Sequence, residues 1–281
     1  MKKILLSIIA VLALTPAVKA WNGALHTAVA AIADANLTAE ARKSIEAALD
    51  NHSIAYYAYW MEEVSDTEQY RHTENWHNVA LTPKGKIIAA KKADKSDAGV
   101  VRRADALEGL SLAVAALQNR ASLSKQEVAD NIRFVVHIMG DLHCPSHYVF
   151  TDLLEERKIK YRYDKESKTR SYMKFWEGDV VHHTFGWKVN EFVHQLNRLS
   201  PEKVAELTKG SVCDWVTANA KVYRPIYSYI EPNQHLTAKT YRPWLNKSFE
   251  MATDQIGVAG YRLAALLNGL FDESAPKKSV K

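Results

Sequence analysis

One segment of the chain, HIMGDLHCPSH, carries histidine and aspartate at spacings that suit metal binding. His137 and Asp141 are four residues apart, so on a helix both side chains lie on one face and can bind one ion. His147 follows beyond Pro145, which must end or kink that helix because proline lacks a backbone N–H. The run indicates a metal site, although taken alone it also fits a buried histidine hydrogen-bonded to an aspartate.

Further candidate ligands lie upstream of this run. The segment YWMEEVSDTEQYRHTENWHNVA offers Glu62 and His77, and His26 lies closer to the N-terminus. Zinc binds imidazole nitrogen and carboxylate oxygen, and a ligand set without thiolates is typical of catalytic rather than structural zinc sites. Together these residues predict a catalytic zinc centre.

Helices are expected to position these groups, because apolar residues recur at helical spacing in most long segments. The clearest examples are Val128 to Met139, which leads into the metal-binding run, and Ile256 to Leu270 near the C-terminus. The pattern predicts an all-α protein. In KIKYRYDKESKTRSYMKF, apolar and polar residues instead alternate around a polar turn, which predicts a small β-hairpin near residues 158–173.

The first twenty residues have the features of a secretory signal peptide. Lys2 and Lys3 precede an apolar run from Ile4 to Leu14, and small residues in Val18–Ala20 suit cleavage after Ala20. This run is shorter than the roughly 20 residues of a membrane span, and no second long apolar stretch follows. We therefore expect no transmembrane segment and a periplasmic or secreted protein.

A single domain is expected over residues 21–273, because no linker-like segment divides the chain. Residues 274–281, SAPKKSVK, are expected to be a disordered tail. The formal charge of +5 falls to +2 without the three lysines of the first twenty residues. Overall basicity is therefore weak support for a nucleic-acid partner.

The chain contains two cysteines, Cys144 and Cys213. Cys144 lies within the metal-binding run but has no second cysteine nearby, so we interpret it as structural. In an oxidising export compartment the two could form a disulfide, and the sequence leaves this open because it does not give their separation.

Taken in order, these segments resemble the zinc-dependent single-strand-specific nucleases of the fungal S-one/P-one type, which share a helical fold with bacterial zinc-dependent phospholipase C. The resemblance covers nearly the whole chain after residue 20. It rests on the segments WNGALH, YWMEE, WH, HIMGDLHCPSH, FWE and AGYRLAALLN. It implies a single helical domain of the phospholipase C and nuclease type that binds two to three Zn²⁺ ions.

The residues that the resemblance implies as metal ligands are Trp21, His26, Glu62, His77, His137, Asp141, His147 and Glu177. The first two would hold one ion, with Trp21 acting through its α-amine and its carbonyl oxygen. The next three would hold a second ion, and Asp141 would bridge these two ions and orient the attacking water. The last two would belong to a third, more separate ion.

The third site departs from the family pattern. Met173 stands four residues before Glu177, where the family has a histidine, and a thioether is a poorer zinc ligand than imidazole. His182 or His183 could complete the site; otherwise it is weak or empty. Glu62 and Glu177 each stand where an aspartate is usual.

The nucleotide pocket departs further. Ser65 stands where the family often has an arginine, Asn78 where it often has an aromatic residue that stacks a base, and Ala80 where it often has an acid. Base stacking is a main source of affinity for single strands. The metal ligands therefore match the family more closely than the nucleotide pocket does.

The resemblance implies an exported zinc-dependent endonuclease that hydrolyses phosphodiester bonds of single-stranded RNA and DNA to 5′-phosphate products through a metal-activated water. Its partner would be the single-stranded nucleic acid, and a monomer is expected. Two alternatives stay open. One is a zinc-dependent phosphodiesterase or phospholipase C that acts on another phosphoester, and the other is a metal-binding relative with impaired catalysis.

Overall fold

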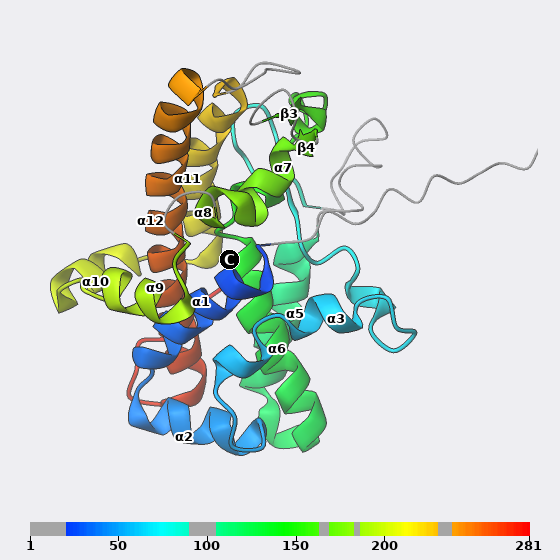
Figure 1. Ribbon diagram of the computed structural model, residues 1–281. Coiled ribbons are helices and arrows are strands. Elements are labelled where there is room, and N and C mark those ends of the chain that lie inside the picture. Colours follow the sequence, from blue (N-terminus) through cyan, green and yellow to red (C-terminus); the bar gives the residue numbers. More distant parts are fainter. Residues whose placement is uncertain (1–20, 90–104, 163–168, 183–185, 230–237) are drawn as a thin grey trace, which may run out of the picture.

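The computed structural model describes residues 21–89, 105–162, 169–182, 186–229 and 238–281, and these are mostly helical (Figure 1). The helices are α1 (Gly23–Ala35), α2 (Ala39–Ala48), α3 (Trp60–Val64), α5 (Ala106–Gln118), α6 (Lys125–Asp141), α7 (Tyr172–Lys174), α8 (Val180–His182), α9 (Val189–Leu196), α10 (Pro201–Leu207), α11 (Val212–Tyr223) and α12 (Ala238–Phe271). Shorter helical turns used below are η1 (Ile54–Tyr57), η2 (Arg71–Thr73), η5 (Pro145–His147), η6 (Glu156–Lys158) and the π-helix η7 (Phe175–Asp179). The prediction of an all-α protein is confirmed.

Four short strands accompany the helices in the described ranges. Strands β1 (Val79–Leu81) and β2 (Tyr148–Phe150) pair in parallel. Strands β3 (Lys160–Tyr161) and β4 (Arg170–Ser171) pair antiparallel, so the β-hairpin expected near residues 158–173 is confirmed. Residues 163–168, where its turn was expected, lie outside the described residues.

Helix α6 has a well-defined start and a well-defined end. Ser124 and Glu127 form a capping box, in which the Glu127 carboxylate accepts a 2.7 Å hydrogen bond from the Ser124 backbone N–H. The second half of the helix, from Ile132 to Asp141, is buried throughout. The helix ends at Asp141, ahead of Pro145, as the sequence predicts.

The core includes the crossing of α1 and α12, the longest helix of the described chain (Figure 1). Val29 and Ile32 of α1 are buried there. Gly260 of α12 faces them, and a Cβ at that position would lie 2.6 Å from Ile32 Cβ and 3.2 Å from the Val29 carbonyl oxygen. Glycine therefore lets the two helices approach closely. Among the described helices, none is long and apolar enough to cross a membrane.

The expectation that residues 274–281 are disordered is wrong. The Val212 N–H donates to the Ser279 carbonyl (3.1 Å), the Cys213 N–H donates to the Val280 carbonyl (2.9 Å), and the Val280 side chain is buried. These two N–H groups lie in the first turn of α11, where they have no partner within the helix. The tail supplies the missing acceptors, which its polar composition did not indicate.

The possible disulfide between Cys144 and Cys213 is also not formed, because both cysteines are free thiols. Cys144 is buried, and its sulfur lies 3.0 Å from the Ser146 hydroxyl. Cys213 lies in the first turn of α11, beside the C-terminal tail. The interpretation of Cys144 as a structural residue agrees with its burial.

We predict that Gly260→Ala destabilises the fold by about 1 to 3 kcal/mol, because its methyl group would overpack the contact with Ile32. Thermal or urea unfolding would measure this change. Gly257→Ala on the same helix is the matched control, since its nearest neighbour would be Leu196 Cβ at an ordinary 3.6 Å. The control should be neutral or slightly stabilising, because alanine favours a helix by up to about 1 kcal/mol over glycine. Equal unfolding free energies for the two variants would contradict the close packing.

Candidate metal centre

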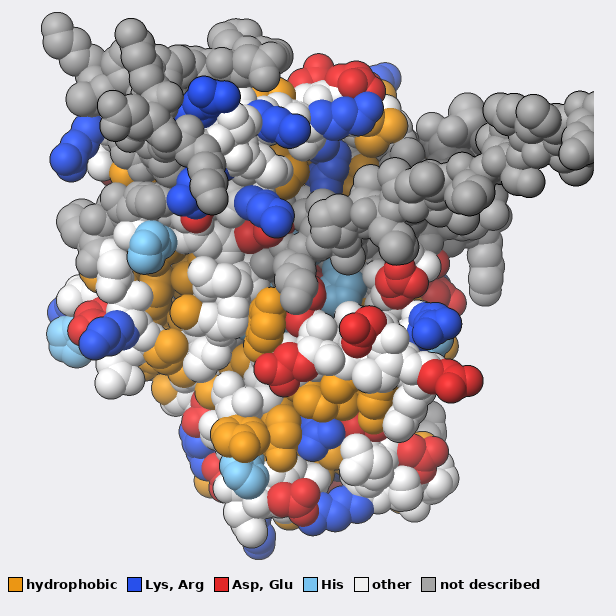
Figure 2. Space-filling view, turned by 45° about the vertical axis from the view of Figure 1, so that its right-hand side comes forward, with side chains coloured by type: hydrophobic (Ala, Val, Ile, Leu, Met, Phe, Trp, Pro, Cys, Tyr) orange, Lys and Arg blue, Asp and Glu red, His pale blue; other side chains and the backbone are white. Residues whose placement is uncertain are grey.

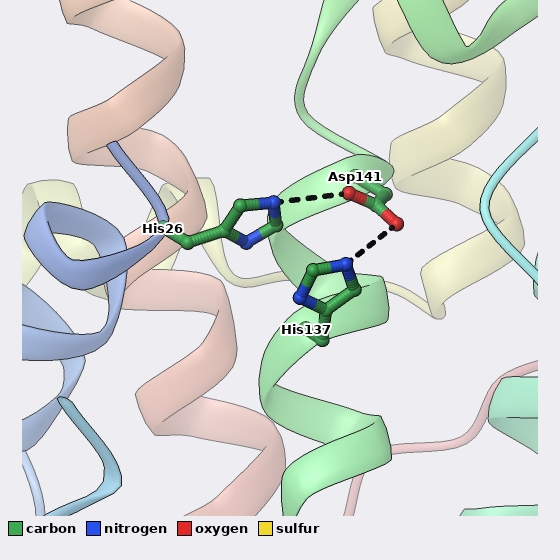
Figure 3. A group of neighbouring side chains, drawn as sticks. All are labelled: His26, His137 and Asp141. Carbon is green, nitrogen blue, oxygen red and sulfur yellow. Dashed lines mark ion pairs between the residues drawn. The ribbon is translucent and has the colours of Figure 1, made fainter. Parts of the chain in front are cut away.

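Helices α1 and α6 bring three of the expected ligands together. Asn22 caps α1 by accepting a 3.1 Å hydrogen bond from the Leu25 N–H, which fixes the first turn that carries His26. His137 and Asp141 project from one face of the last turn of α6, as their spacing predicts. All three side chains are buried and point toward one another (Figure 3).

The parallel pair β1 and β2 brings in two further histidines. The pairing aligns Val79 with Tyr148. His77 lies two residues before β1, and His147 lies immediately before β2. Because parallel strands begin at the same edge, both histidines reach the same end of this small sheet. Residue types and spacing did not predict this pairing.

Asp141 lies at the middle of the cluster. Its Oδ1 is 3.2 Å from His26 Nε2, and its Oδ2 is 2.9 Å from His77 Nδ1 and 3.5 Å from His137 Nε2. Figure 3 shows that the two carboxylate oxygens face different histidines, one toward His26 and one toward His137. A carboxylate in this position can bind two cations at once, one through each oxygen.

Two overlapping groups of side chains are close enough to share an ion. The first consists of His26, His137 and Asp141, and the second consists of Glu62, His77 and His137. Within each group the possible ligand atoms lie within 4.8 Å of one another. The second group contains the three residues that the resemblance implies for one ion.

The geometry of His137 favours metal binding. Its Nδ1 lies 2.9 Å from the Ala58 carbonyl oxygen, so Nδ1 carries the proton and donates it to that carbonyl. The lone pair is then on Nε2, which faces Asp141 and Glu62. Such a backbone acceptor fixes the ring orientation of a ligating histidine and raises its basicity.

A close contact with glycine fixes His26. A Cβ at Gly140 would lie 2.6 Å from Nδ1 and 2.8 Å from Cε1 of the His26 ring. The other side of His26 is set by His137, whose ring stacks on it at a centroid distance of 4.1 Å and an interplanar angle of 8°. Only glycine therefore allows α6 to hold His26 in this position.

Burial determines the protonation of these groups. Desolvation, reinforced by the nearby imidazoles of His137, His147 and His77, lowers the pKa of His26 well below its usual value. Desolvation likewise lowers the pKa of His77, and it lowers that of His147 to about 3. These imidazoles are therefore neutral near pH 7, which is the form that binds a metal ion.

The carboxyl groups respond in the opposite direction. Desolvation raises the pKa of Asp141 well above its usual value and raises that of Glu177 to about 8. Both shifts mean that a buried negative charge here lacks compensation from the protein alone. A divalent cation among these side chains would supply it.

Several buried polar atoms support the same interpretation. Within the described residues, His26 Nε2, His137 Nε2, Asp141 Oδ1 and both ring nitrogens of His147 have no hydrogen-bond partner, nor does Glu177 Oε1. Buried polar atoms are nearly always paired, so such a concentration needs an explanation. Nitrogen and oxygen donors of these types fit zinc.

The expected third site is less complete. His147, Glu177 and Met173 are buried, and η5, which carries His147, packs against α7 and η7, which carry the other two. His147 and Glu177 are in neither ligand group. His182 is exposed at the end of α8, so it is not among the residues that the structure brings together here. His183 lies outside the described residues.

Trp21, the residue expected to follow the cleavage site, is buried beside these elements. The N–H of the next residue, Asn22, donates a 2.6 Å hydrogen bond to the Glu177 carbonyl. Gly178 permits this approach, because a Cβ there would collide with the Asn22 side chain. The start of α1 is therefore fixed against the π-helix η7, and π-helical turns often occur at functional sites.

The three positions at which the nucleotide pocket was expected to differ lie close to these ligands. Ser65 ends α3, and its hydroxyl donates a 3.3 Å hydrogen bond to the Glu62 carbonyl. Asn78 follows His77, and Ala80 is fully buried in β1. Tyr59 also flanks the cluster, with its ring 6.1 Å from that of His26.

Two parts of this site were missed from the sequence. Gly140 offered a weak signal, because glycine inside a helix is unfavourable and usually has a packing or functional reason. The Ala58 carbonyl offered none, since a backbone acceptor can come from any residue type. His143, in the same run as His137 and His147, is structural: it is buried, and its Nε2 accepts a 3.1 Å hydrogen bond from Arg262.

The chain matches a protein-family model. Residues 21–272 match the model of the S1/P1 Nuclease family. The match starts at Trp21, and it contains both ligand groups. A search of curated proteins found no match.

We predict that Gly140→Ala lowers zinc affinity by about 10- to 100-fold, because the added methyl group displaces the His26 ring, and loss of such supporting contacts typically has this effect. Competition with a chromophoric chelator would measure the affinity. Gly257→Ala, a helical glycine with room for a methyl group, is the matched control. If Gly140→Ala folds and binds zinc as tightly as this control, Gly140 has no part in positioning His26.

Proposed function

The chain belongs to the S1/P1 nuclease family, and from this membership we propose that it is an exported, zinc-dependent endonuclease acting on single-stranded RNA and DNA. Membership implies a nuclease that hydrolyses phosphodiester bonds and a nucleic-acid partner. The zinc dependence, the preference for single strands, the 5′-phosphate products, the export and the monomeric state are our proposal. The observation that carries it is the buried Asp141 carboxylate, with one oxygen facing His26 and the other facing His77 and His137.

We assign the ligands from the two groups of close side chains. His26 and Asp141 would hold one ion, together with the α-amine and carbonyl oxygen of Trp21. Glu62, His77 and His137 would hold the second, and Asp141 would bridge the two. The distances between the ligand atoms support this assignment. His147 and Glu177 would hold a third ion weakly, because Met173 offers a thioether in place of an imidazole.

When bound, the ions would polarise the phosphodiester, lower the pKa of a water for in-line attack and neutralise the leaving oxygen. The protein's own part is to fix the geometry. Asp141 is held by the end of α6, and its Oδ2 lies 2.9 Å from His77 Nδ1, so its carboxylate is already oriented. In this position it is suited to orient the attacking water between the two groups. Burial of the cluster excludes other water, which strengthens every electrostatic interaction inside the site.

We propose that removal of residues 1–20 completes the site. A free α-amine has a pKa near 7.7 to 8.0, so it can lose its proton and bind zinc near neutral pH. Together with its own carbonyl oxygen it would form a five-membered chelate. The burial of Trp21 and the hydrogen bond from Asn22 to Glu177 support this role, because they fix the start of the mature chain.

A zinc-dependent phospholipase C or another phosphodiesterase is the second candidate. It is favoured by the nucleotide pocket, where Asn78 and the fully buried Ala80 replace groups with which the family often holds a base. A metal-binding relative with impaired catalysis is the third candidate, and it is favoured by Met173.

We predict that the mature, zinc-loaded protein releases acid-soluble nucleotides from single-stranded DNA and RNA, and that a chelator abolishes the release. The same preparation should hydrolyse phosphatidylcholine much more slowly. Elemental analysis of the dialysed protein should give two tightly held zinc ions for each chain.

The outcomes separate the candidates. Preferential hydrolysis of phosphatidylcholine would favour the second candidate. Two bound zinc ions without turnover of any phosphodiester would favour the third. Asp141→Asn is the matched inactive control, because the amide keeps the shape of the carboxylate but not its charge.

We predict that one extra residue before Trp21 lowers zinc affinity and activity together, because a peptide nitrogen cannot replace the free α-amine as a ligand. Mature protein that begins at Trp21 should be compared with protein that begins with Met-Trp21, by zinc titration and by initial rate. A fully active Met-Trp21 protein would refute this role of the N-terminus. Unfolding temperatures measured with chelator present would show whether the extra residue disturbs the fold itself.

A further inference from the structure

Arg157, in η6, lies beside the metal centre but outside both ligand groups. Its Nη1 donates hydrogen bonds to the Tyr148 carbonyl (3.1 Å) and to the Tyr227 hydroxyl (3.2 Å). Tyr148 directly follows the expected ligand His147, and the Tyr227 hydroxyl itself donates to the Tyr148 carbonyl (3.1 Å). The guanidinium is therefore held one residue away from an expected metal ligand.

Within the described part of the chain, the charge of Arg157 has no acidic partner. Both acceptors of its guanidinium are uncharged, and within the described residues it takes part in no ion pair. Arg224, at the start of the helical turn η8 (Arg224–Ser228) and over the Phe150 ring of β2, differs in this respect. It donates to both oxygens of Asp152, at 3.1 and 2.5 Å. Arg157 is partly exposed, so an anion in solution can reach it.

The positive charge of Arg157 affects the pKa values of His147 and Glu177, two residues of the expected third site. With desolvation as the largest cause, Arg157 contributes to the lowered pKa of His147, and it opposes the rise in the pKa of Glu177. Lys174 opposes that rise more strongly. Met173 makes this the side with the weakest expected zinc ligands, so positive charge from the side chains matters most here.

The surface around the site is asymmetric in charge. On one side, exposed acidic residues lie in and around α3 and η2. On the other side, exposed basic residues lie in η6, β3, β4 and α7. The acidic residues are Glu63, Asp66, Glu68 and Glu74. The basic residues are Lys158, Lys160, Arg170 and Lys174, of which Lys158 pairs with Glu155 and Arg170 pairs with Asp179. In Figure 2 several Lys and Arg side chains lie in the upper part of the face with some Asp and Glu side chains among them, and further Asp and Glu side chains lie at the lower right. Within the described residues Lys160 and Lys174 are in no ion pair, so together with Arg157 they would attract a polyanion to this side.

We propose that Arg157 binds a backbone phosphate of the nucleic-acid strand next to the scissile phosphodiester, and so directs the strand across the η6–α7 side of the site. A guanidinium suits this role because its planar fork can donate two parallel hydrogen bonds to phosphate oxygens. Nη1 is anchored by Tyr148 and Tyr227, so the side chain is already ordered before the strand binds. This inference rests on the proposed nuclease function.

The test measures binding of a fluorescent eight-residue oligodeoxythymidylate with phosphorothioate linkages to the zinc-loaded mature protein, with the oligonucleotide checked for cleavage after each titration. Anisotropy gives Kd between 50 and 300 mM salt. Loss of one phosphate contact on a single strand reduces the slope of log Kd against log salt by about 0.7. For Arg157→Gln we expect this reduction and Kd about tenfold higher near 100 mM salt.

Two further variants isolate the cause. Arg157→Lys keeps the charge and should retain the wild-type salt slope. Arg224→Gln removes the same charge from an arginine that is already paired, so its slope should be unchanged and its Kd should stay within about twofold of the wild-type value. Zinc content should be the same in all variants. In steady-state assays Arg157→Gln should raise KM more than it lowers kcat.

The inference is overturned if Arg157→Gln keeps the wild-type slope and Kd, or if it loses zinc, because Arg157 would then act through the metal centre. It is also overturned if Arg224→Gln has the same effect as Arg157→Gln, since that would be a general effect of net charge. Failure of the wild-type protein to cleave nucleic acid would instead refute the proposed function. The two failures are therefore distinguishable.

Discussion

The buried carboxylate of Asp141 is the constraint on which the rest of the site depends. Its side chain is fully buried, and its two oxygens lie within 3.5 Å of nitrogens of three imidazoles, those of His26, His77 and His137. Desolvation raises the pKa of this carboxyl group well above its usual value. Concentrating these groups in the interior is unfavourable for the protein alone, because several of their polar atoms, Asp141 Oδ1 among them, have no hydrogen-bond partner within the described residues. A bound cation converts the same arrangement into a stable one, so fold and metal affinity are linked.

The surrounding elements keep the side chains of His26, His137 and Asp141 in this unfavourable arrangement. Helix α6 is capped at one end and buried along its second half, so it carries His137 and Asp141 on a rigid element. The Ala58 carbonyl sets the tautomer of His137, and the absence of a side chain at Gly140 makes room for His26. The first turn of α1 is bonded to η7 through Asn22. Each support comes from a different part of the chain, which is why the site needs the whole domain.

The two sides of the site differ in their chemistry. One side has Asp141 and a nearly complete set of imidazole and carboxylate ligands. The other side has Met173 in place of a histidine, and there a positive charge comes from Arg157, whose guanidinium is anchored by neutral oxygen atoms. A fixed cation attracts phosphate whether or not an ion occupies the weaker site. On the role proposed for Arg157, substrate binding on this side would depend less on metal occupancy than the proposed catalysis between the two ligand groups.

The sequence by itself determined the elements and the chemistry of the ligands. Helical spacing, the alternation near residue 160 and the stop at Pro145 depend on local geometry, so the helices, the hairpin and the shared face of His137 and Asp141 followed from it. The tertiary structure alone decided what depends on distant contacts. These are the parallel pairing that brings His77 to His147, the docking of the tail on α11, the two free cysteines and the anchoring of Arg157. The pairing, the docking and the anchoring join residues far apart in the chain through backbone groups or close packing. Contacts of these kinds have no signature in residue type or spacing.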